Sequence, residues 1–246
     1  MVPFIDTHCH LDLFKNIRDN VKYEDELEIK TITVTNAPFL LEHNELLFKE
    51  CRNIRVGLGL HPELVAKYGY ELNLFEFLCV TTKYIGEIGL DGSAIYRGLW
   101  GQQLIIFRQI LKILSKVDRK ILTIHSRNAA SVTIEELHKE LKDTDHRIIL
   151  HWFSGTIKEL DLAVKVGYYF SINHKMISTK KGIDLINAMP QERILTETDA
   201  PFTFDASITT REKSIRLTVK QLSLLWHIPF QEAKKKIYDN FRILLN

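Results

Sequence analysis

The sequence is poor in several features that would mark a specialised class of protein. Its three cysteines, Cys9, Cys51 and Cys79, are scattered and none lies in a CxxC pair, which argues against a disulfide framework. No apolar run approaches the roughly 18 residues of a membrane helix. The opening MVPFIDTHCH lacks the pattern of a signal peptide. We therefore expect a cytoplasmic protein with reduced thiols and no membrane partner.

A large charge of one sign is also lacking. Lys and Arg number 33 against 31 Asp and Glu, a net charge of +2, which excludes a histone-like nonspecific binder. An enzyme acting on nucleic acid is not excluded, because a local basic rim and bound divalent cations can hold phosphates. No Pro/Gly-rich linker or low-complexity stretch divides the chain, so we expect one domain over residues 1–246.

The sequence does contain eight short apolar runs, each followed by a helix-sized segment. They are rich in Ile, Val and Leu and do not alternate strictly, as expected for parallel strands buried on both faces. The runs are Val2–Asp6, Ile29–Thr35, Ile54–Leu58, Tyr84–Ile88, Ile121–His125, Arg147–His151, Tyr168–Ile172 and Arg193–Thr196.

Helical patterns lie between and after these runs. Leu104, Phe107 and Leu111 share one helix face, and Gly167 predicts the end of a shorter helix. The tail predicts helices over 211–226 and 230–244. Eight strand–helix repeats in 246 residues are typical of an α/β protein with a (β/α)₈ TIM-like barrel. A doubly wound open sheet is the alternative, but no Gly-rich phosphate fingerprint follows any strand.

Metal-ligating residue types fall at the ends of five predicted strands. The carboxyl ends of barrel strands converge on one face, so these side chains should be neighbours in space. One such residue alone is more typical of a hydrogen-bonded side chain, and it is their shared register that favours a metal site. Cys9, between two of them, should face the helix layer. The predicted ligands are His8, His10, Glu87, His125, His151 and Asp199.

Imidazole and carboxylate ligands suit a pair of divalent ions, Zn²⁺, Mn²⁺ or Mg²⁺. We expect His125 and His151 on one ion, Glu87 as a bridge, and the other three ligands on the second ion. Two ions could activate a water against a phosphodiester. Asp199 is expected to act as general base, so Asp199 and Glu87 are the predicted catalytic residues.

Two further acids lie two residues before predicted ligands. Asp6 and Glu197 should point into the barrel and orient imidazoles or ligand carboxylates. Pairing with a neighbouring basic group is the alternative for each.

The chain resembles the TatD family of metal-dependent deoxyribonucleases, within the wider amidohydrolase-like barrels. The resemblance covers essentially the whole sequence and implies a TIM-like barrel, the same six ligands, and 3′→5′ exonuclease action on DNA, single-stranded or at 3′ ends. The matching stretches are FIDTHCHLD (4–12), GLGLHPE (57–63), IGEIGLD (85–91), Gln103–Phe107, IHSRNA (124–129), LHWFSG (150–155), TETDAPF (196–202) and the closing IYDNFRILL.

Three loops depart from the family pattern. The loop after the third strand often reads HPH, whereas Glu63 stands third here; the turn 92–94 is Gly-Ser-Ala; and the Arg-Asn-Glu-Pro segment after DAPF is missing. Such trimmed loops look like the short TatD-like proteins of Qat-type anti-phage gene sets. That branch would imply protein partners of a defence operon.

Substrate contacts are predicted from basic residues near the strand ends. Arg127 can hold phosphate oxygens bidentately, and His61 is a second candidate phosphate contact. Trp152 should point outward by alternation and pack, while Lys180 and Lys181 should be solvated helix residues. Two other functions stay open: an amidohydrolase-type reaction on a small ester, amide or phosphoester, and a binding subunit of a larger assembly.

Overall fold

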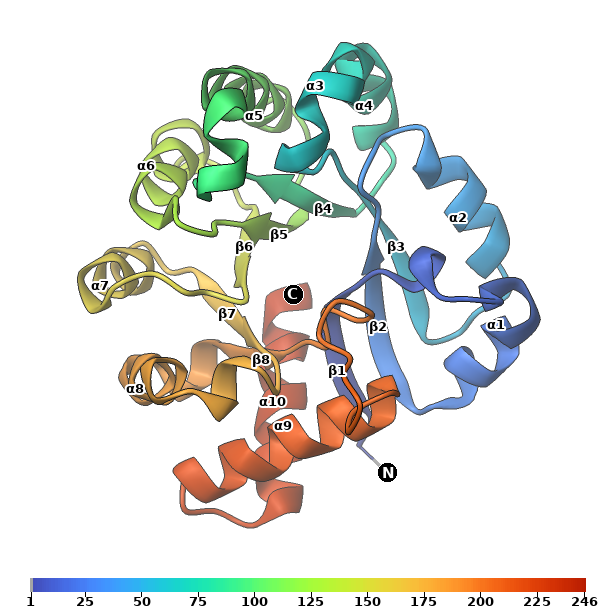
Figure 1. Cartoon of the computed structure of the whole chain (residues 1–246), viewed down its shortest axis with the longest axis vertical. Coiled ribbons are helices and arrows are strands. Elements are labelled where there is room, and N and C mark those ends of the chain that lie inside the picture. Colours follow the sequence, from blue (N-terminus) through green and yellow to red (C-terminus); the bar gives the residue numbers. More distant parts are fainter. Residues whose placement is uncertain (1) are drawn as a thin grey trace.

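The computed structural model describes residues 2–246 and contains one eight-stranded sheet. All seven neighbouring pairs are parallel, in the order β1 to β8. The strands curl into a nearly closed barrel, as the sequence predicted (Figure 1). They are β1 (Phe4–Cys9), β2 (Ile29–Val34), β3 (Ile54–Leu58), β4 (Tyr84–Gly89), β5 (Ile121–His125), β6 (Arg147–His151), β7 (Tyr169–Ile172) and β8 (Ile194–Thr196).

Helices surround the strands (Figure 1). The last of them, α10, packs against both β1 and β8 and so covers the place where the barrel closes. Within residues 2–246, no helix is long and apolar enough to cross a membrane. The helices are α1 (Ile17–Glu26), α2 (Leu40–Phe48), α3 (Val65–Tyr68), α4 (Leu72–Cys79), α5 (Trp100–Leu114), α6 (Ala130–Leu141), α7 (Ile157–Lys165), α8 (Lys180–Ala188), α9 (Arg211–Leu225) and α10 (Phe230–Leu245).

The local signals of the sequence correspond to physical features of the helices. Phe107 and Leu111 form part of the buried face of α5. Gly167 has φ of 86°, and the N–H of Tyr168 donates to the carbonyl of Ala163 at 3.0 Å, so this glycine ends α7 in the left-handed conformation that glycine adopts without strain.

The first strand differs from its prediction. The apolar signal ends near Ile5, whereas β1 runs from Phe4 to Cys9. Its pairing with β2 shifts register between Asp6 and Cys9, which marks an irregularity in the ladder. The polar second half of the strand is buried, so tertiary contacts rather than hydrophobicity hold it there. His8 therefore lies within the strand and His10 directly after it.

The barrel closes through loop and side-chain hydrogen bonds. Among residues 2–246, no strand ladder joins β1 to β8. Instead, Thr7 Oγ1 donates to the carbonyl of Thr196 at 3.2 Å. Beyond the end of β8, the N–H of Asp199 donates to the carbonyl of His8 in β1 at 2.9 Å. The carboxyl ends of β1 and β8 are thereby fixed side by side.

Candidate metal centre

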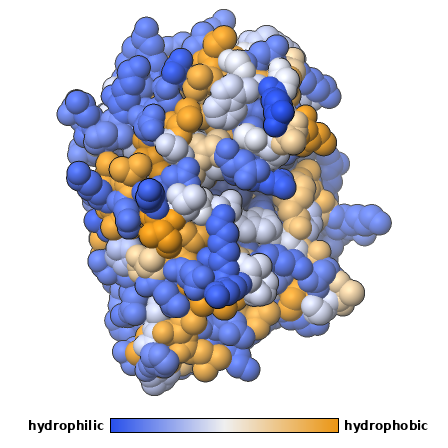
Figure 2. All heavy atoms as spheres, turned by 60° about the vertical axis from the view of Figure 1, so that its left-hand side comes forward, coloured by the Kyte–Doolittle hydropathy of each residue, from blue (hydrophilic) through white to orange (hydrophobic). Residues whose placement is uncertain are grey.

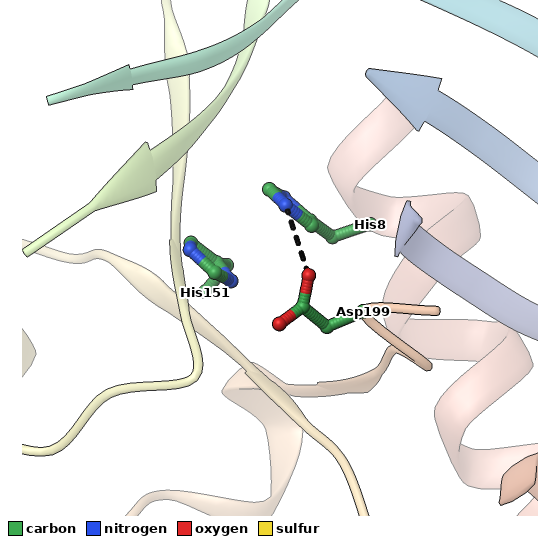
Figure 3. Close-up of side chains that lie close together, drawn as sticks. All are labelled: His8, His151 and Asp199. Atoms are coloured by element: carbon green, nitrogen blue, oxygen red, sulfur yellow. Dashed lines mark ion pairs between the residues drawn. The ribbon is translucent and has the colours of Figure 1, made fainter. Parts of the chain in front are cut away.

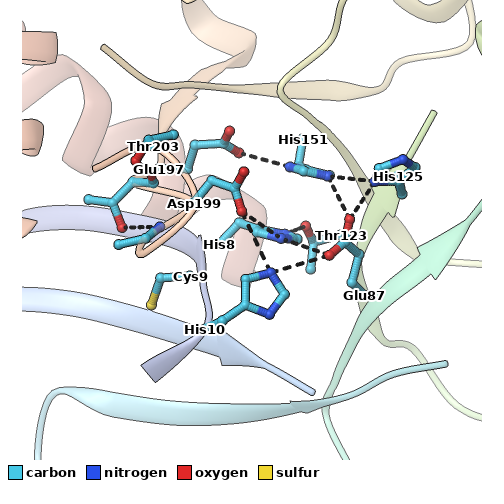
Figure 4. Close-up of polar contacts among 12 residues, drawn as sticks. His8, Cys9, His10, Glu87, Thr123, His125, His151, Glu197, Asp199 and Thr203 are labelled. Carbon is cyan, nitrogen blue, oxygen red and sulfur yellow. Dashed lines mark hydrogen bonds and ion pairs between the residues drawn. The ribbon is translucent and has the colours of Figure 1, made fainter. Parts of the chain in front are cut away.

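The six predicted ligands converge at the carboxyl ends of the strands, where the carboxylate of Glu87 approaches all four imidazoles (Figure 4). Glu87 Oε2 lies 3.3 Å from Nε2 of both His8 and His10. The other oxygen, Oε1, lies 2.6 Å from His125 Nδ1 and 2.8 Å from His151 Nε2. The two oxygens of one buried carboxylate thus face two different pairs of imidazoles.

Asp199 approaches the first pair of imidazoles. Its Oδ1 lies 3.8 Å from His8 Nε2 and 3.6 Å from His10 Nε2, and Figure 3 shows the carboxylate directed at the His8 ring. The rings of His8 and His151 stack with centroids 3.9 Å apart, which places the two imidazole pairs against each other.

A close approach of three strand ends holds Glu87 in place. Its N–H donates to the carbonyl of Thr35 at 3.0 Å, and its own carbonyl accepts from the N–H of Leu60 at 3.0 Å. A Cβ at Gly59 would lie 1.8 Å from the Thr35 carbonyl and 2.4 Å from the Glu87 nitrogen. Glycine is therefore required at position 59, because any side chain would push Glu87 out of the site.

In two of the imidazoles, His125 and His8, the ring nitrogen that points away from Glu87 has a partner of its own. His125 Nε2 lies 2.8 Å from Asp91 Oδ2, and His8 Nδ1 lies 2.6 Å from Thr123 Oγ1. Such partners fix the orientation of a ligating ring. The sequence reasoning missed both residues, although Asp91 stands four positions after Glu87 and shares its side of the strand end.

Glu197 and Asp6, predicted as orienting acids, make different contacts. Glu197 Oε2 lies 3.7 Å from His151 Nδ1, and its Oε1 accepts from Asn173 at 2.8 Å. Asp6 touches no imidazole. Its carboxylate accepts from the N–H and hydroxyl of Thr198 at 2.8 and 2.7 Å and from Arg211 Nε at 3.0 Å. The alternative of pairing with a basic group is what the structure shows for Asp6.

Arg211 forms a buried network around Asp6. The first residue of α9, it is fully buried and also donates to Glu24 at 2.8 Å and to Thr31 at 2.5 Å. Through Asp6 this guanidinium is connected to Thr198, the residue that precedes Asp199. Cys9, by contrast, lies away from the imidazoles, and its thiol contacts the Ile32 carbonyl, as the alternation of β1 predicted (Figure 4).

His61 lies nearer the centre than a substrate contact alone requires. Its Nε2 is 3.3 Å from Glu87 Oε1, and its Nδ1 accepts from the N–H of Glu63 at 3.2 Å. With Glu87 and His125 it forms a further group whose ligand atoms lie within 4.8 Å of one another. His61 therefore adds a seventh side chain of metal-ligating type to this cluster.

The electrostatic environment of the imidazole cluster favours the binding of a cation. Burial lowers the pKa of His8 to about 4, assisted by the charge of His151. Burial also disfavours a charged His10, but hydrogen bonds to Asp199 and Glu87 outweigh it and raise the pKa to about 9. The buried His8 Nε2 has no hydrogen-bond partner among the described residues. An unpartnered nitrogen facing buried carboxylate oxygens is a donor set that suits a divalent ion.

A cavity of about 550 Å³ opens over this centre. Arg127 lines it, and among residues 2–246 no acidic group lies within ion-pair distance of its guanidinium. Trp152 packs against the core, as predicted, but it also lines this cavity and so does not point wholly outward. Strand β6 ends at His151, and Trp152 has φ of 38°, so strand alternation no longer applies. The other lining residues are His10, Asn36, His61, Glu63, Leu64, Glu87, His125, Ser126, His151, Ser154, Asp199 and Phe202.

Comparison with known proteins agrees with this architecture. Residues 5–246 match the family described as TatD related DNase. The chain is 28% identical to an uncharacterized metal-dependent hydrolase of Buchnera aphidicola, over 98% of each protein. It is 28% identical to the human deoxyribonuclease TATDN3, covering 81% of this chain and 78% of that protein.

A solved structure shares the fold. The crystal structure of a TatD homologue from Escherichia coli, YJJV, superposes with a TM-score of 0.87 at 24% identity, covering 99% of this chain and 98% of the other. Because the family match spans nearly all of the sequence, this chain belongs to the TatD family.

Proposed function

We propose that this protein is a metal-dependent hydrolase of DNA phosphodiester bonds, a 3′→5′ exonuclease that uses two divalent ions. The observation that carries the proposal is the position of Glu87, whose two oxygens face separate imidazole pairs at 2.6–3.3 Å. One carboxylate so placed can be shared by two cations. Membership of the family supports the phosphodiester as the bond that is cut.

We divide the residues into two ligand groups around Glu87, although the ligand atoms of His151 also lie within 4.8 Å of those of His8 and Asp199. His125 and His151 would hold one ion, with His61 close by, and Asp199 would join His8 and His10 at the other. When bound, a pair of divalent ions stabilises negative charge on the reacting phosphate and lowers the pKa of water. The mixture of nitrogen and oxygen ligands suits Zn²⁺, Mn²⁺ or Mg²⁺.

The remaining chemistry belongs to the protein's own side chains. Asp199 lines the cavity and, in this proposal, accepts a proton from the attacking water. Asp91 holds His125 Nε2 at 2.8 Å, which keeps that ring directed at Glu87, and the Glu197 carboxylate lies 3.7 Å behind His151 Nδ1. Arg127 can bind two phosphate oxygens through its planar guanidinium.

The shape of the cavity supports a strand end as substrate. Its volume, about 550 Å³, lies in the range of small-molecule sites, so it can enclose a terminal nucleotide but not a continuous duplex. Trp152 and Phe202 on its wall offer aromatic faces on which a base can stack whatever its identity. The 3′→5′ direction is an inference from the family resemblance.

The test uses metal-depleted protein and single-stranded DNA labelled at either end, with Mg²⁺, Mn²⁺, Zn²⁺ or EDTA. We expect cation-dependent cleavage that shortens 5′-labelled DNA stepwise and releases mononucleotides from 3′-labelled DNA. Glu87→Gln and Asp199→Asn should reduce cleavage to background, while the exposed controls Glu45→Gln and Asp161→Asn retain it.

Four results would count against the proposal. Cleavage in EDTA would contradict the metal requirement, and full activity of Glu87→Gln would contradict the shared ligand. If no DNA is cut with any cation, but small esters or phosphoesters are, the amidohydrolase-type reaction becomes the better explanation. Hydrolysis of neither class of substrate would favour the binding subunit.

A further inference from the structure

A second, shallower cavity lies next to the first. Its volume is about 320 Å³, and it is formed where α7 and α8 begin. The segment after β6 connects the two cavities, because Trp152 and Ser154 line the first while the residues that follow line the second. The second cavity is lined by Gly155, Thr156, Ile157, Lys180, Lys181, Asp184 and Leu185.

Two exposed lysines border this second cavity, whose lining is otherwise largely apolar. Lys181 Nζ donates to the carbonyl of Ser154 at 2.6 Å, which places its ammonium at the border between the cavities. Lys180 is exposed, and among residues 2–246 neither lysine lies within ion-pair distance of a carboxylate. Asp184 is the one acid in the lining, a helical turn beyond Lys180. Nearby Lys175 differs, because it pairs with Asp205.

The charges around the first cavity are unequal on its two sides. Glu63, in the 3₁₀ turn after β3, supplies an unmatched acid at one side. Arg127 and Lys181 supply cations near the loops that follow β5 and β6. Figure 2 shows the side of the molecule that carries α6 to α8, where hydrophilic side chains surround smaller hydrophobic patches. A polyanion leaving the first cavity is attracted toward this side and repelled by Glu63.

We propose that the second cavity binds backbone phosphates of single-stranded DNA on the 5′ side of the bond that is cut. This inference rests on the proposed function. If the 3′-terminal nucleotide occupies the first cavity, the rest of the strand must leave along the rim, and the route past Ser154 leads to Lys180 and Lys181. Lys180 and Lys181 each neutralise one phosphate there.

The magnitude follows from counterion release. Each phosphate neutralised on a single strand contributes about 0.7 to the slope of log affinity against log salt. Two contacts therefore contribute a slope of about 1.4, which corresponds to roughly 25-fold in affinity at 0.1 M salt. A dinucleotide that fills only the first cavity should be insensitive to both lysines.

The experiment measures binding and cleavage separately. Binding of a fluorescent 12-nucleotide single strand is followed by anisotropy between 25 and 200 mM salt, in the Glu87→Gln background. Lys180→Ala/Lys181→Ala should weaken binding about 25-fold at 0.1 M salt and lower the slope by about 1.4. The matched control, Lys139→Ala/Lys142→Ala, removes two exposed lysines where α6 ends and should change neither.

Cleavage by the otherwise active enzyme gives the second readout. The double variant should lose kcat/KM on the 12-nucleotide strand and stay within about twofold of the parent on a dinucleotide. Unchanged affinity and salt slope overturn the inference, as does an equal loss on both substrates. If the parent protein cuts no DNA but the double variant still loses binding, the proposed nuclease activity is refuted and the phosphate site remains supported. The single variant Lys180→Ala keeps the Lys181–Ser154 contact, so a loss of binding in it cannot come from disruption of that contact.

Discussion

Replacing Arg211 by methionine removes the guanidinium that Asp6 and Glu24 share. Methionine fills the space of the aliphatic part of the side chain, so the perturbation is chiefly one of charge. Asp6 is fully buried and would be left without its cation. Removing one partner of a buried pair costs about 3–5 kcal/mol, because the other charge stays buried without compensation.

The structure places this case at the lower end of that range. Asp6 keeps two hydrogen bonds from Thr198, at 2.8 and 2.7 Å, and Glu24 is 7% exposed and can turn toward water. We therefore expect Arg211→Met to lower the free energy of unfolding by about 3 kcal/mol. Lys235→Met, on α10 and in an exposed pair with Asp239, should cost under about 0.5 kcal/mol.

The assay is urea unfolding followed by far-ultraviolet circular dichroism in EDTA. A third variant, Asp6→Asn/Arg211→Met, removes the uncompensated charge and should be more stable than Arg211→Met alone, since the two positions interact directly. A loss below about 1 kcal/mol in Arg211→Met, or no recovery in the double variant, would refute the electrostatic reasoning.

Three further predictions concern the centre and the cavity. Asp91→Asn removes the charge behind His125 and should lower Mn²⁺ affinity in calorimetric titration about 10–100-fold; an unchanged affinity would show that Asp91 does not support the ring. Because the pKa of His10 is raised to about 9, a cation must displace its proton at pH 7. Zn²⁺ affinity should therefore rise toward pH 9, with a binding enthalpy that depends on the buffer. Arg127→Ala should lower kcat/KM on DNA about 10–100-fold, whereas Arg147→Ala, at the start of β6, should not; equal losses would argue against a phosphate contact.

The barrel could be predicted because its physical causes are local. Apolar runs such as Ile121–His125 mark strands buried on both faces, and that run matches β5 at both ends. Since parallel strands end on one face, the convergence of His125 and His151 follows from the order of the strands alone. The partnership with a defence operon stays a prediction.

Other features depend on contacts that no local pattern encodes. Arg211 begins a helix, where an arginine is ordinarily solvated, yet it is buried against Asp6, 205 positions away in the sequence. The direction of Trp152 could not be predicted either, because the alternation rule applies only while the backbone is extended. His61 reaches Glu87 because β3 and β4 are neighbours and Gly59 allows their ends to approach closely.

The hydrogen bonds that close the barrel have a consequence for the order of folding. Thr7 and Thr196, which bond across the closure, are 189 positions apart, and such distant contacts are the slowest to form. Asp199 meets His8 and His10 at this same closure. During synthesis, a chain that ends before β8 carries the imidazoles of β1, β5 and β6 but lacks one carboxylate and the contacts that align them. The complete ligand set therefore exists only after the chain extends past Asp199 and the barrel has closed.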